Sequence, residues 1–200
     1  MSRTETQLQA IREKTRTKIL DAATRVFTRR GFAAANMLDI SREASISVGL
    51  IYRHFKTKEE LFGALLKRAA KGLEDVTQFF TQSLPPKQLF QDFTDEIIND
   101  LCHNDDFSNF MVLISQAFMT EDFIPEVNEL VKQNRAMVKQ VAAVIRSGQK
   151  RDEFKSGNPN IMALYYFSSI QGLSETKFAL KDKFLPPTSE ILLGFLIKEK

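Results

Sequence analysis

Apolar residues recur at helical spacing along most of the chain, and no stretch alternates strictly enough to predict a β-strand. The first apolar series, from Ile11 to Phe27, lies on one face of a helix. Gly31 should end this helix, because glycine readily adopts the left-handed conformation found at helix C-termini. The pattern therefore predicts an all-α protein with about nine helices.

Capping residues and prolines divide the remainder into further helices. Asn36 and Ser47 can each cap a short helix, the first over about 37–44 and the second ending near Phe55. Thr57 and Glu60 form a capping box at the start of a long helix over about 58–81. Prolines and polar clusters separate further expected helices at about 87–103, 107–119, 124–148, 159–181 and 187–199. We expect two domains, 1–62 and 63–200, joined within the long helix rather than by a flexible linker.

Charge divides the chain at nearly the same place. Residues 1–71 carry 15 Lys and Arg against 7 Asp and Glu, whereas residues 72–200 carry 13 against 18, so the balance changes from +8 to −5. A basic end that faces a polyanion explains this asymmetry, and a chance run of solvated charge is the alternative. The chain has no apolar signal segment at its N-terminus, no run near ~18 apolar residues, and only one cysteine, Cys102. We therefore expect a cytoplasmic protein without membrane contact.

The first three expected helices have the spacing of a helix-turn-helix module. Ile40, Ala44, Ile46, Ile51 and Phe55 can close a small core, and the last two stack on one side of the third helix because they are four residues apart. The other residues of that helix are left outside the core, beside basic side chains. A helix presented in this way can enter the major groove of DNA.

An ordered set of positions in this region carries a family resemblance. The set comprises Gly31-Phe32, Asp39-Ile40 with Ala44, Ser47-x-Gly49-x-Ile51-Tyr52-x-His54-Phe55, and Lys58-Glu59-x-Leu61. It resembles the TetR family of bacterial transcriptional regulators over about residues 15–62. The resemblance implies a homodimer whose recognition helices read successive major grooves of a palindromic operator in double-stranded DNA. It also implies a helical ligand-binding and dimerisation domain, in which an unknown small molecule spreads the two reading heads and releases DNA.

The expected DNA-binding residues are Asn36, Arg42, Ser47, Val48, Gly49, Leu50, Tyr52, Arg53, His54 and Lys58. The resemblance implies phosphate contacts for Asn36, Tyr52, His54 and Lys58, and it places Val48, Leu50 and Arg53 at variable positions. We expect these three to face bases, unless Val48 and Leu50 extend the core; solvation alone is the alternative for Arg42 and His54. Asn36 departs from the usual threonine, and Ser45 stands where the family often has glycine. The basic residues before Lys18 could form an arm that reaches DNA, although a frayed terminus is the simpler interpretation.

The part after residue 71 holds 13 of the 17 phenylalanines and two strongly apolar helices. The last helix is apolar on nearly every side from Ile191 to Ile197, and its exposure to water would cost ~25 cal/mol per Å². We expect burial against a second copy in the four-helix bundle that the resemblance implies, with burial inside one chain as the alternative. The expected interface residues are Leu164, Phe167, Ile170, Ile191, Leu192 and Phe195.

Aromatic and methionine side chains in the middle of the chain are candidates for a ligand pocket, although core packing is the simpler role for each alone. Together they favour a lipophilic or aromatic ligand over a sugar phosphate. The candidates are Phe79, Phe90, Phe93, Phe110, Met111, Phe118 and Met137.

Catalytic and metal-binding patterns are lacking in the sequence. Cys102 and His103 are neighbours, and neighbours on a helix point about 100° apart, so they are not poised as nucleophile and base. Two histidines and one cysteine provide no spaced zinc set, and no glycine-rich phosphate loop is present. We expect a DNA-binding repressor with no catalytic residue, metal or cofactor. A regulator controlled by a protein partner and an enzyme built on a helical scaffold are the two other hypotheses.

Overall fold

The computed structural model describes residues 3–119 and 124–198. Within these residues the chain forms nine α-helices, one 3-10 helix and no strand, apart from an isolated bridge between Phe154 and Ile197. The all-α prediction is therefore confirmed. The helices are α1 (Arg3–Ala34), α2 (Met37–Glu43), α3 (Val48–His54), α4 (Lys58–Phe79), α5 (Pro86–His103), α6 (Asp105–Phe118), α7 (Glu126–Lys150), α8 (Pro159–Leu180), η1 (Lys181–Lys183) and α9 (Ser189–Leu193).

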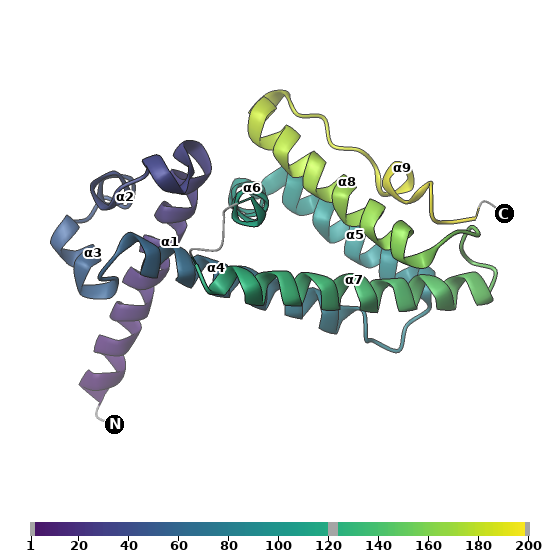
Figure 1. Cartoon of the computed structure of the whole chain (residues 1–200), viewed down its shortest axis with the longest axis horizontal. Helices are drawn as coiled ribbons and strands as arrows, with labels where there is room; N and C mark the ends of the chain where they lie inside the picture. The colour runs from purple at the N-terminus through teal and green to yellow at the C-terminus, as the bar shows by residue number, and fades with distance from the viewer. Residues whose placement is uncertain (1–2, 120–123, 199–200) are drawn as a thin grey trace.

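Helices α1 to α3 form a reading module at one end of the molecule (Figure 1). Of the five predicted core residues, Ile40, Ala44, Ile51 and Phe55 are each at most 1% exposed, and Ile46 is half-buried against the same core. Ser47 caps α3, where its hydroxyl accepts from the Leu50 amide at 3.2 Å. Local capping and spacing at four residues thus build the module, as the sequence predicts.

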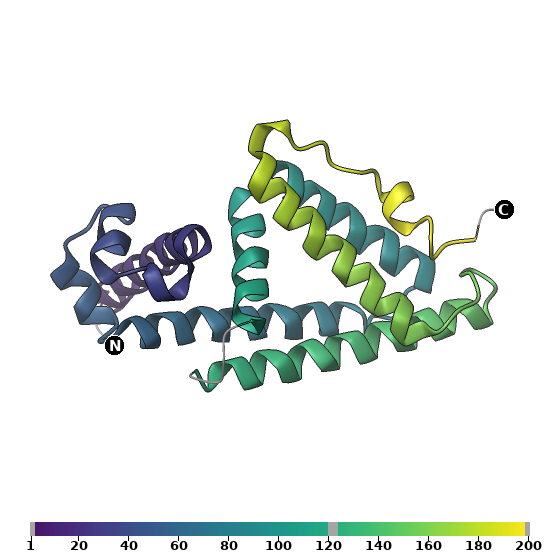
Figure 2. The same cartoon turned by 45° about the horizontal axis from the view of Figure 1, so that its top comes forward.

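Helix α4 carries the chain from the reading module into the larger part and lies beside α7 along much of its length (Figures 1 and 2). At its start, the Glu60 amide donates to the Thr57 hydroxyl at 3.0 Å. The Glu60 carboxylate accepts from the amide of Lys56, at 2.6 Å, one residue earlier than a capping box would have it. Because Phe62 shares one core with Leu113 of α6, the core of the reading module continues across the expected domain boundary at residue 62.

A second core lies among α5, α7, α8 and α9, and aromatic rings dominate it. The ring of Phe80 lies 5.2 Å from that of Phe90 and 5.1 Å from that of Phe93, measured between centroids. Phe90 also makes an edge contact with Tyr166 at 5.2 Å. Tyr166 and Thr94 share a hydrogen bond of 2.6 Å inside this cluster.

The predicted helix at 187–199 is wrong in length, because α9 contains only five residues. After Gly194 the chain turns and bonds to the connection between α7 and α8, where the Lys155 amide donates to the Leu196 carbonyl at 2.8 Å. Leu192, Leu193 and Leu196 are 8%, 2% and 0% exposed within the single chain. The apolar run is therefore largely buried by its own protomer, the alternative to burial against a second copy.

Candidate nucleic-acid interface

The outer side of α3 presents a continuous strip of exposed residues, because Ile51 alone of this helix is fully buried. Val48 is 36% exposed and Tyr52 is 45% exposed, and Arg53 lies beside them on the surface. A side chain at Gly49 would begin in open space, with no atom within 4 Å of an added Cβ. Another molecule can therefore approach the backbone of α3 closely at Gly49.

Helix α2 contributes polar groups next to this strip. Asn36 is exposed and caps α2, with its side-chain oxygen accepting from the Asp39 amide at 2.9 Å. Its side-chain amide N–H groups remain available to a phosphate. Arg42 is exposed on α2, and no carboxylate among the described residues pairs with it.

Lys58 is placed differently from the other predicted phosphate contacts. Its ammonium donates to the carbonyls of Phe32, Ala33 and Ala35, at 2.7, 3.2 and 3.0 Å. It also lies 4.5 Å from the centroid of the Phe32 ring. An ammonium has three donors, so in this conformation Lys58 joins the start of α4 to the end of α1 and has no donor left for a phosphate.

His54 is half-buried at the end of α3 and faces the N-terminal half of α1. Burial lowers its pKa, and the charges of Arg12 and Arg16 lower the pKa further, while Glu13 opposes this effect. The side chain therefore lies at the edge of the exposed strip, beside two arginines.

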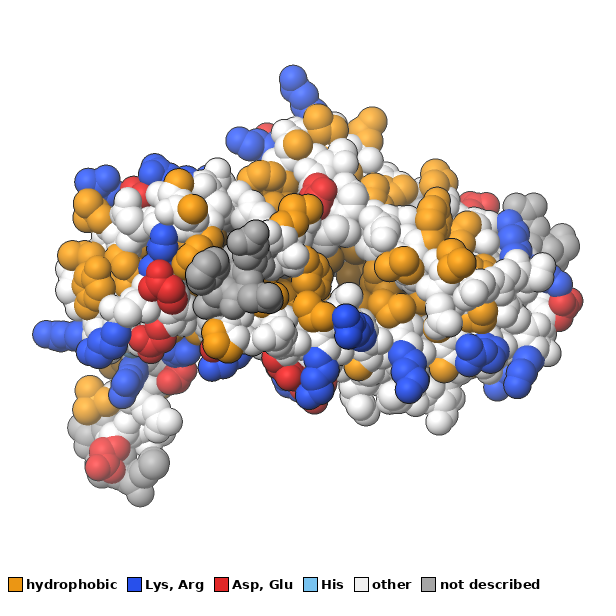
Figure 3. Space-filling view, viewed as in Figure 1, with side chains coloured by type: hydrophobic (Ala, Val, Ile, Leu, Met, Phe, Trp, Pro, Cys, Tyr) orange, Lys and Arg blue, Asp and Glu red, His pale blue; other side chains and the backbone are white. Residues whose placement is uncertain are grey.

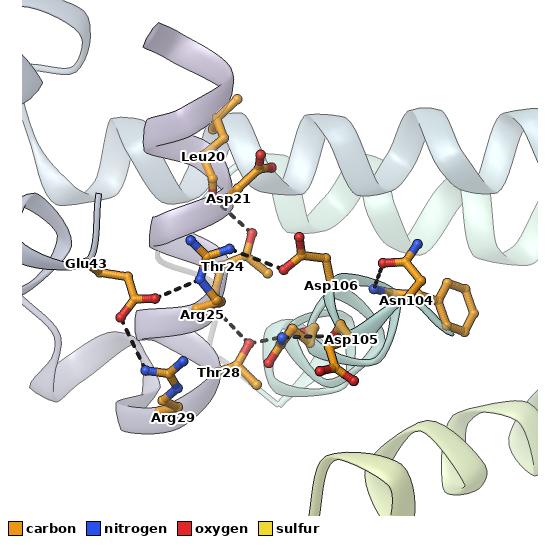
Figure 4. A network of polar contacts seen from close by, with 12 residues as sticks. Leu20, Asp21, Thr24, Arg25, Thr28, Arg29, Glu43, Asn104, Asp105 and Asp106 are labelled. Atoms are coloured by element: carbon orange, nitrogen blue, oxygen red, sulfur yellow. Dashed lines mark hydrogen bonds and ion pairs between the residues drawn. The ribbon is translucent and has the colours of Figure 1, made fainter. Parts of the chain in front are cut away.

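The C-terminal half of α1 carries an ion-pair network that sequence reasoning missed. Figure 4 shows Arg25 between Glu43 of α2 and Asp106 of α6. Its guanidinium pairs with the two carboxylates at N–O distances of 2.7 and 3.2 Å. Arg29 also pairs with Glu43, at 3.2 Å. The hydrogen bond from Arg25 lowers the pKa of Glu43. Since Asp106 is 81 residues away from Arg25, no local sequence pattern indicates this pair.

Further bonds attach α6 to both sides of the junction. The Thr28 hydroxyl donates to the Asn109 carbonyl at 3.0 Å, which joins α1 to α6 (Figure 4). On the other side, Gln171 of α8 donates to the Met111 carbonyl at 3.0 Å. Helix α6 is thus bonded to the reading module and to α8.

Known proteins share this architecture. A protein-family sequence model, described as bacterial regulatory proteins of the tetR family, matches residues 19–65. An HTH-type transcriptional repressor of Mycobacterium tuberculosis is 46% identical over 55 residues, which cover 28% of this chain and 29% of that protein. The HTH-type transcriptional regulator UidR of Escherichia coli is 29% identical over 149 residues, covering 73% of this chain and 72% of UidR. The chain belongs to the TetR family.

Among solved structures, SmeT in complex with triclosan has a TM-score of 0.67 and 18% identity, and the match covers 93% of each chain. At this identity the likeness concerns the fold, and it extends over both parts of this TetR-family chain. The named relatives are regulators of transcription, as expected from the sequence.

The ligand-pocket candidates of this TetR-family chain do not gather around one apolar cavity. Phe90, Phe93 and Met137 are 0%, 7% and 3% exposed, and Phe79 packs 5.4 Å from the ring of Phe93. Met111 contacts both cores, and Phe118 is 42% exposed at the end of α6. Phe110 lines a cleft of about 420 Å³ between α1, α4 and α6, together with charged residues such as Arg68 and Asp21. In this conformation, most of the candidates are therefore core residues, as the simpler interpretation had it.

The predicted interface residues divide into two groups. Leu164 is 56% exposed on α8, Ile191 is 71% exposed on α9, and Phe167 and Phe195 are half-buried. Ile170 and Leu192 are 2% and 8% exposed, so the prediction needs correction for these two. Their side chains fill the second core and leave little surface for a partner.

Among the described residues, no helix is long and apolar enough to cross a bilayer.

Proposed function

We propose that the protein is a homodimeric repressor that binds a palindromic operator and is released by a small lipophilic or aromatic molecule. The observation that carries the DNA-binding part is the outer strip of α3, where Gly49 and Arg53 lie opposite the buried Ile51 and the exposed Val48 and Tyr52 flank them. Arg53 supplies donors for guanine or phosphate, and Val48 offers an apolar contact for a thymine methyl. Two such strips in a symmetric dimer would lie about one helical turn of DNA apart, ~34 Å.

The dimer is supported by an apolar face on α8. Ile161, Leu164 and Tyr165 are 65%, 56% and 56% exposed, at the helical spacing that places them on one side. Phe195 extends this face, since its ring lies 4.7 Å from that of Tyr165. Figure 3 shows hydrophobic side chains gathered over the region of α8 and α9. An exposed face of this kind is typical of a protein–protein contact, and a second copy is the partner that the family plan favours.

The ligand part of the proposal is supported by the second core. Its phenylalanine rings enclose the hydroxyls of Thr94 and Tyr166, and an apolar surround with few polar groups is typical of small-molecule sites. SmeT, which shares the fold, was solved with triclosan. A ligand that enters this core would displace α6 through α8, and α6 is bonded to α1 by Asp106 and Asn109.

The DNA-binding part can be tested with a duplex selected from a random pool by the full-length protein. Tyr52→Ala and Arg53→Ala should each weaken binding by about tenfold, or ~1.4 kcal/mol. Arg146→Ala is the matched control, because this exposed arginine lies on α7, outside the reading module. Equal binding by all three variants and the wild type would contradict the proposed surface.

Dimerisation and release need separate measurements. Leu164→Glu should convert a dimer to a monomer in sedimentation velocity, whereas Leu185→Glu, at an 88% exposed position outside α8, should not. For release, a panel of apolar aromatic compounds is compared with sugar phosphates for loss of the selected duplex. Release by the sugar phosphates alone would contradict the ligand class.

A further inference from the structure

The two halves of α1 differ in how their basic residues are neutralised. In the C-terminal half, Arg25, Arg29 and Arg30 all pair with carboxylates, Arg30 with Asp39 at 2.9 Å. In the N-terminal half, neither Arg12 nor Lys14 has a carboxylate partner among the described residues. A cation without a carboxylate partner remains available to an anionic group of another molecule, and its position on the helix decides whether it faces the strip on α3.

The N-terminal half of α1 is a helical extension rather than a frayed end. The first fully buried residue of α1 is Ile19, and the helix already begins at Arg3. At ~1.5 Å per residue, the intervening turns extend about 24 Å. Figure 1 shows this end of α1 projecting from the reading module on the side away from α8. If α8 is the dimer face, the extension points away from the dimer axis.

One side of this extension is continuous with the strip on α3. Arg16 lies 4.4 Å from the centroid of the Phe55 ring, at the end of α3. Arg12, one turn earlier, joins Arg16 and His54 around a groove of about 540 Å³. Burial lowers the pKa of His54, the charges of both arginines lower this pKa further, and Glu13 opposes the effect. Two arginines against one carboxylate, Glu13, leave the lining of this groove with a net positive charge, and the groove adjoins Tyr52 and Arg53 on α3.

We propose that Arg12 and Arg16 form a second phosphate-binding surface, which holds the backbone of duplex DNA outside the base pairs that α3 reads. The occupant follows from charge complementarity and from continuity with the α3 strip, so this inference rests on the proposed DNA binding. The expected contact is to phosphate, because arginine binds phosphate oxygens through paired N–H donors and no base contact is needed. Its effect is to raise affinity for DNA with flanking sequence, without changing which bases are preferred.

The test compares Arg12→Ala with Lys14→Ala in the full-length protein. The two positions lie about 200° apart on the helix, so the same charge is removed from opposite sides. Arg16 is not suitable as the main variant, because its contact with Phe55 also supports α3. The probe is the duplex selected from a random pool, in one version with long flanks and in another trimmed to the selected half-sites.

Dissociation constants are measured between 50 and 300 mM KCl, with the slope of log K against log salt as the main result. With long flanks, Arg12→Ala should weaken binding about tenfold and reduce the slope by about 0.9 for each protomer. Lys14→Ala should bind within twofold of the wild type, and Arg12→Lys should restore most of the slope. On the trimmed duplex, the effect of Arg12→Ala should disappear.

Equal effects of Arg12→Ala and Lys14→Ala, or a wild-type slope in Arg12→Ala, would overturn the second surface while the proposed DNA binding stands. Equal weakening of Arg12→Ala on both duplexes would overturn its placement outside the half-sites. If the wild type selects no sequence from the pool, the proposed function and this inference fail together.

Discussion

The reading module and the second core are both built from α-helices, but their candidate functional residues are exposed in the module and buried in the second core. In the module, Ile40, Ile51 and Phe55 fill the core, and the residues of α3 outside it form an exposed strip around Gly49 and Tyr52. In the second core, the aromatic residues pack against one another, and Phe90 and Tyr166 are both 0% exposed. The candidate binding residues of α3 are therefore those that do not pack into the core. A ligand can bind among the residues of the second core only after their packing has changed.

The largest expected effect separates DNA contact from folding within the module. Gly49→Leu should reduce binding to the selected duplex by about 100-fold, or ~2.7 kcal/mol, because the side chain occupies the space in front of α3. The free energy of unfolding should stay the same or rise, since leucine favours a helix over glycine by up to ~0.8 kcal/mol. Both are measured on one preparation, by fluorescence anisotropy and by urea unfolding.

Gly72→Leu is the control for this variant. Gly72 lies on α4 and also has no atom within 4 Å of an added Cβ. Its replacement should change the stability in the same direction and leave DNA binding as it is. A similar loss of binding in both variants would mean that the α3 strip is not the contact surface.

The second expected effect concerns the polar pair inside the aromatic core. Tyr166→Phe removes one partner of a 2.6 Å hydrogen bond and leaves the Thr94 hydroxyl buried without it. The free energy of unfolding should fall by about 1–3 kcal/mol. Adding Thr94→Val should recover much of the loss, because both polar groups are then gone. No recovery in the double variant would show that the pair acts through packing rather than through its hydrogen bond.

Burial of Tyr166 also predicts a pH dependence. Burial raises the pKa of its phenol above the ordinary value of 10.0, so the folded protein keeps the neutral form. The unfolded chain ionises above about pH 10, and stability is therefore lost as the pH rises beyond that value. Tyr166→Phe should show a shallower loss than the wild type in unfolding curves measured between pH 9 and 11.

The same contrast explains how much the sequence could predict. Caps at Asn36 and Ser47 and the pair Ile51 and Phe55 are local, and the structure has them as expected. The short α9 was not predictable, because its end depends on bonds from Lys155 and Lys198 to partners some 40 residues away. Apolar residues at helical spacing indicate burial, but they do not say which element provides it.

Site residues follow the same rule. The exposed side of α3 can be derived from its buried side, whereas the role of Lys58 cannot, since its partners lie 23 to 26 residues earlier in the chain. The ion pairs of Arg25 with Glu43 and Asp106 could not be derived from the sequence pattern either. Local sequence patterns thus do not predict contacts between residues that are distant in sequence.

The third expected effect tests this correction for Lys58. Lys58→Ala removes three hydrogen bonds from an ammonium to carbonyls at the end of α1, so unfolding should become easier by about 1–2 kcal/mol. The salt dependence of DNA binding should keep its wild-type slope, in contrast to Arg12→Ala. A slope reduced by about 0.9 per protomer would show that Lys58 changes partner and binds phosphate in the complex.

The smallest expected effect is a gain of stability in the module. Ser45 adopts a φ of 50°, in the left-handed region, where a Cβ costs roughly 1 kcal/mol. Ser45→Gly should therefore raise the free energy of unfolding by about 0.5–1 kcal/mol, without altering the contacts of α3. Ser156→Gly is the matched control in the second region, because its φ is not positive and glycine there only adds freedom to the unfolded chain. If both variants lose stability in urea unfolding, the turn before α3 is not strained, and serine suits it as well as glycine.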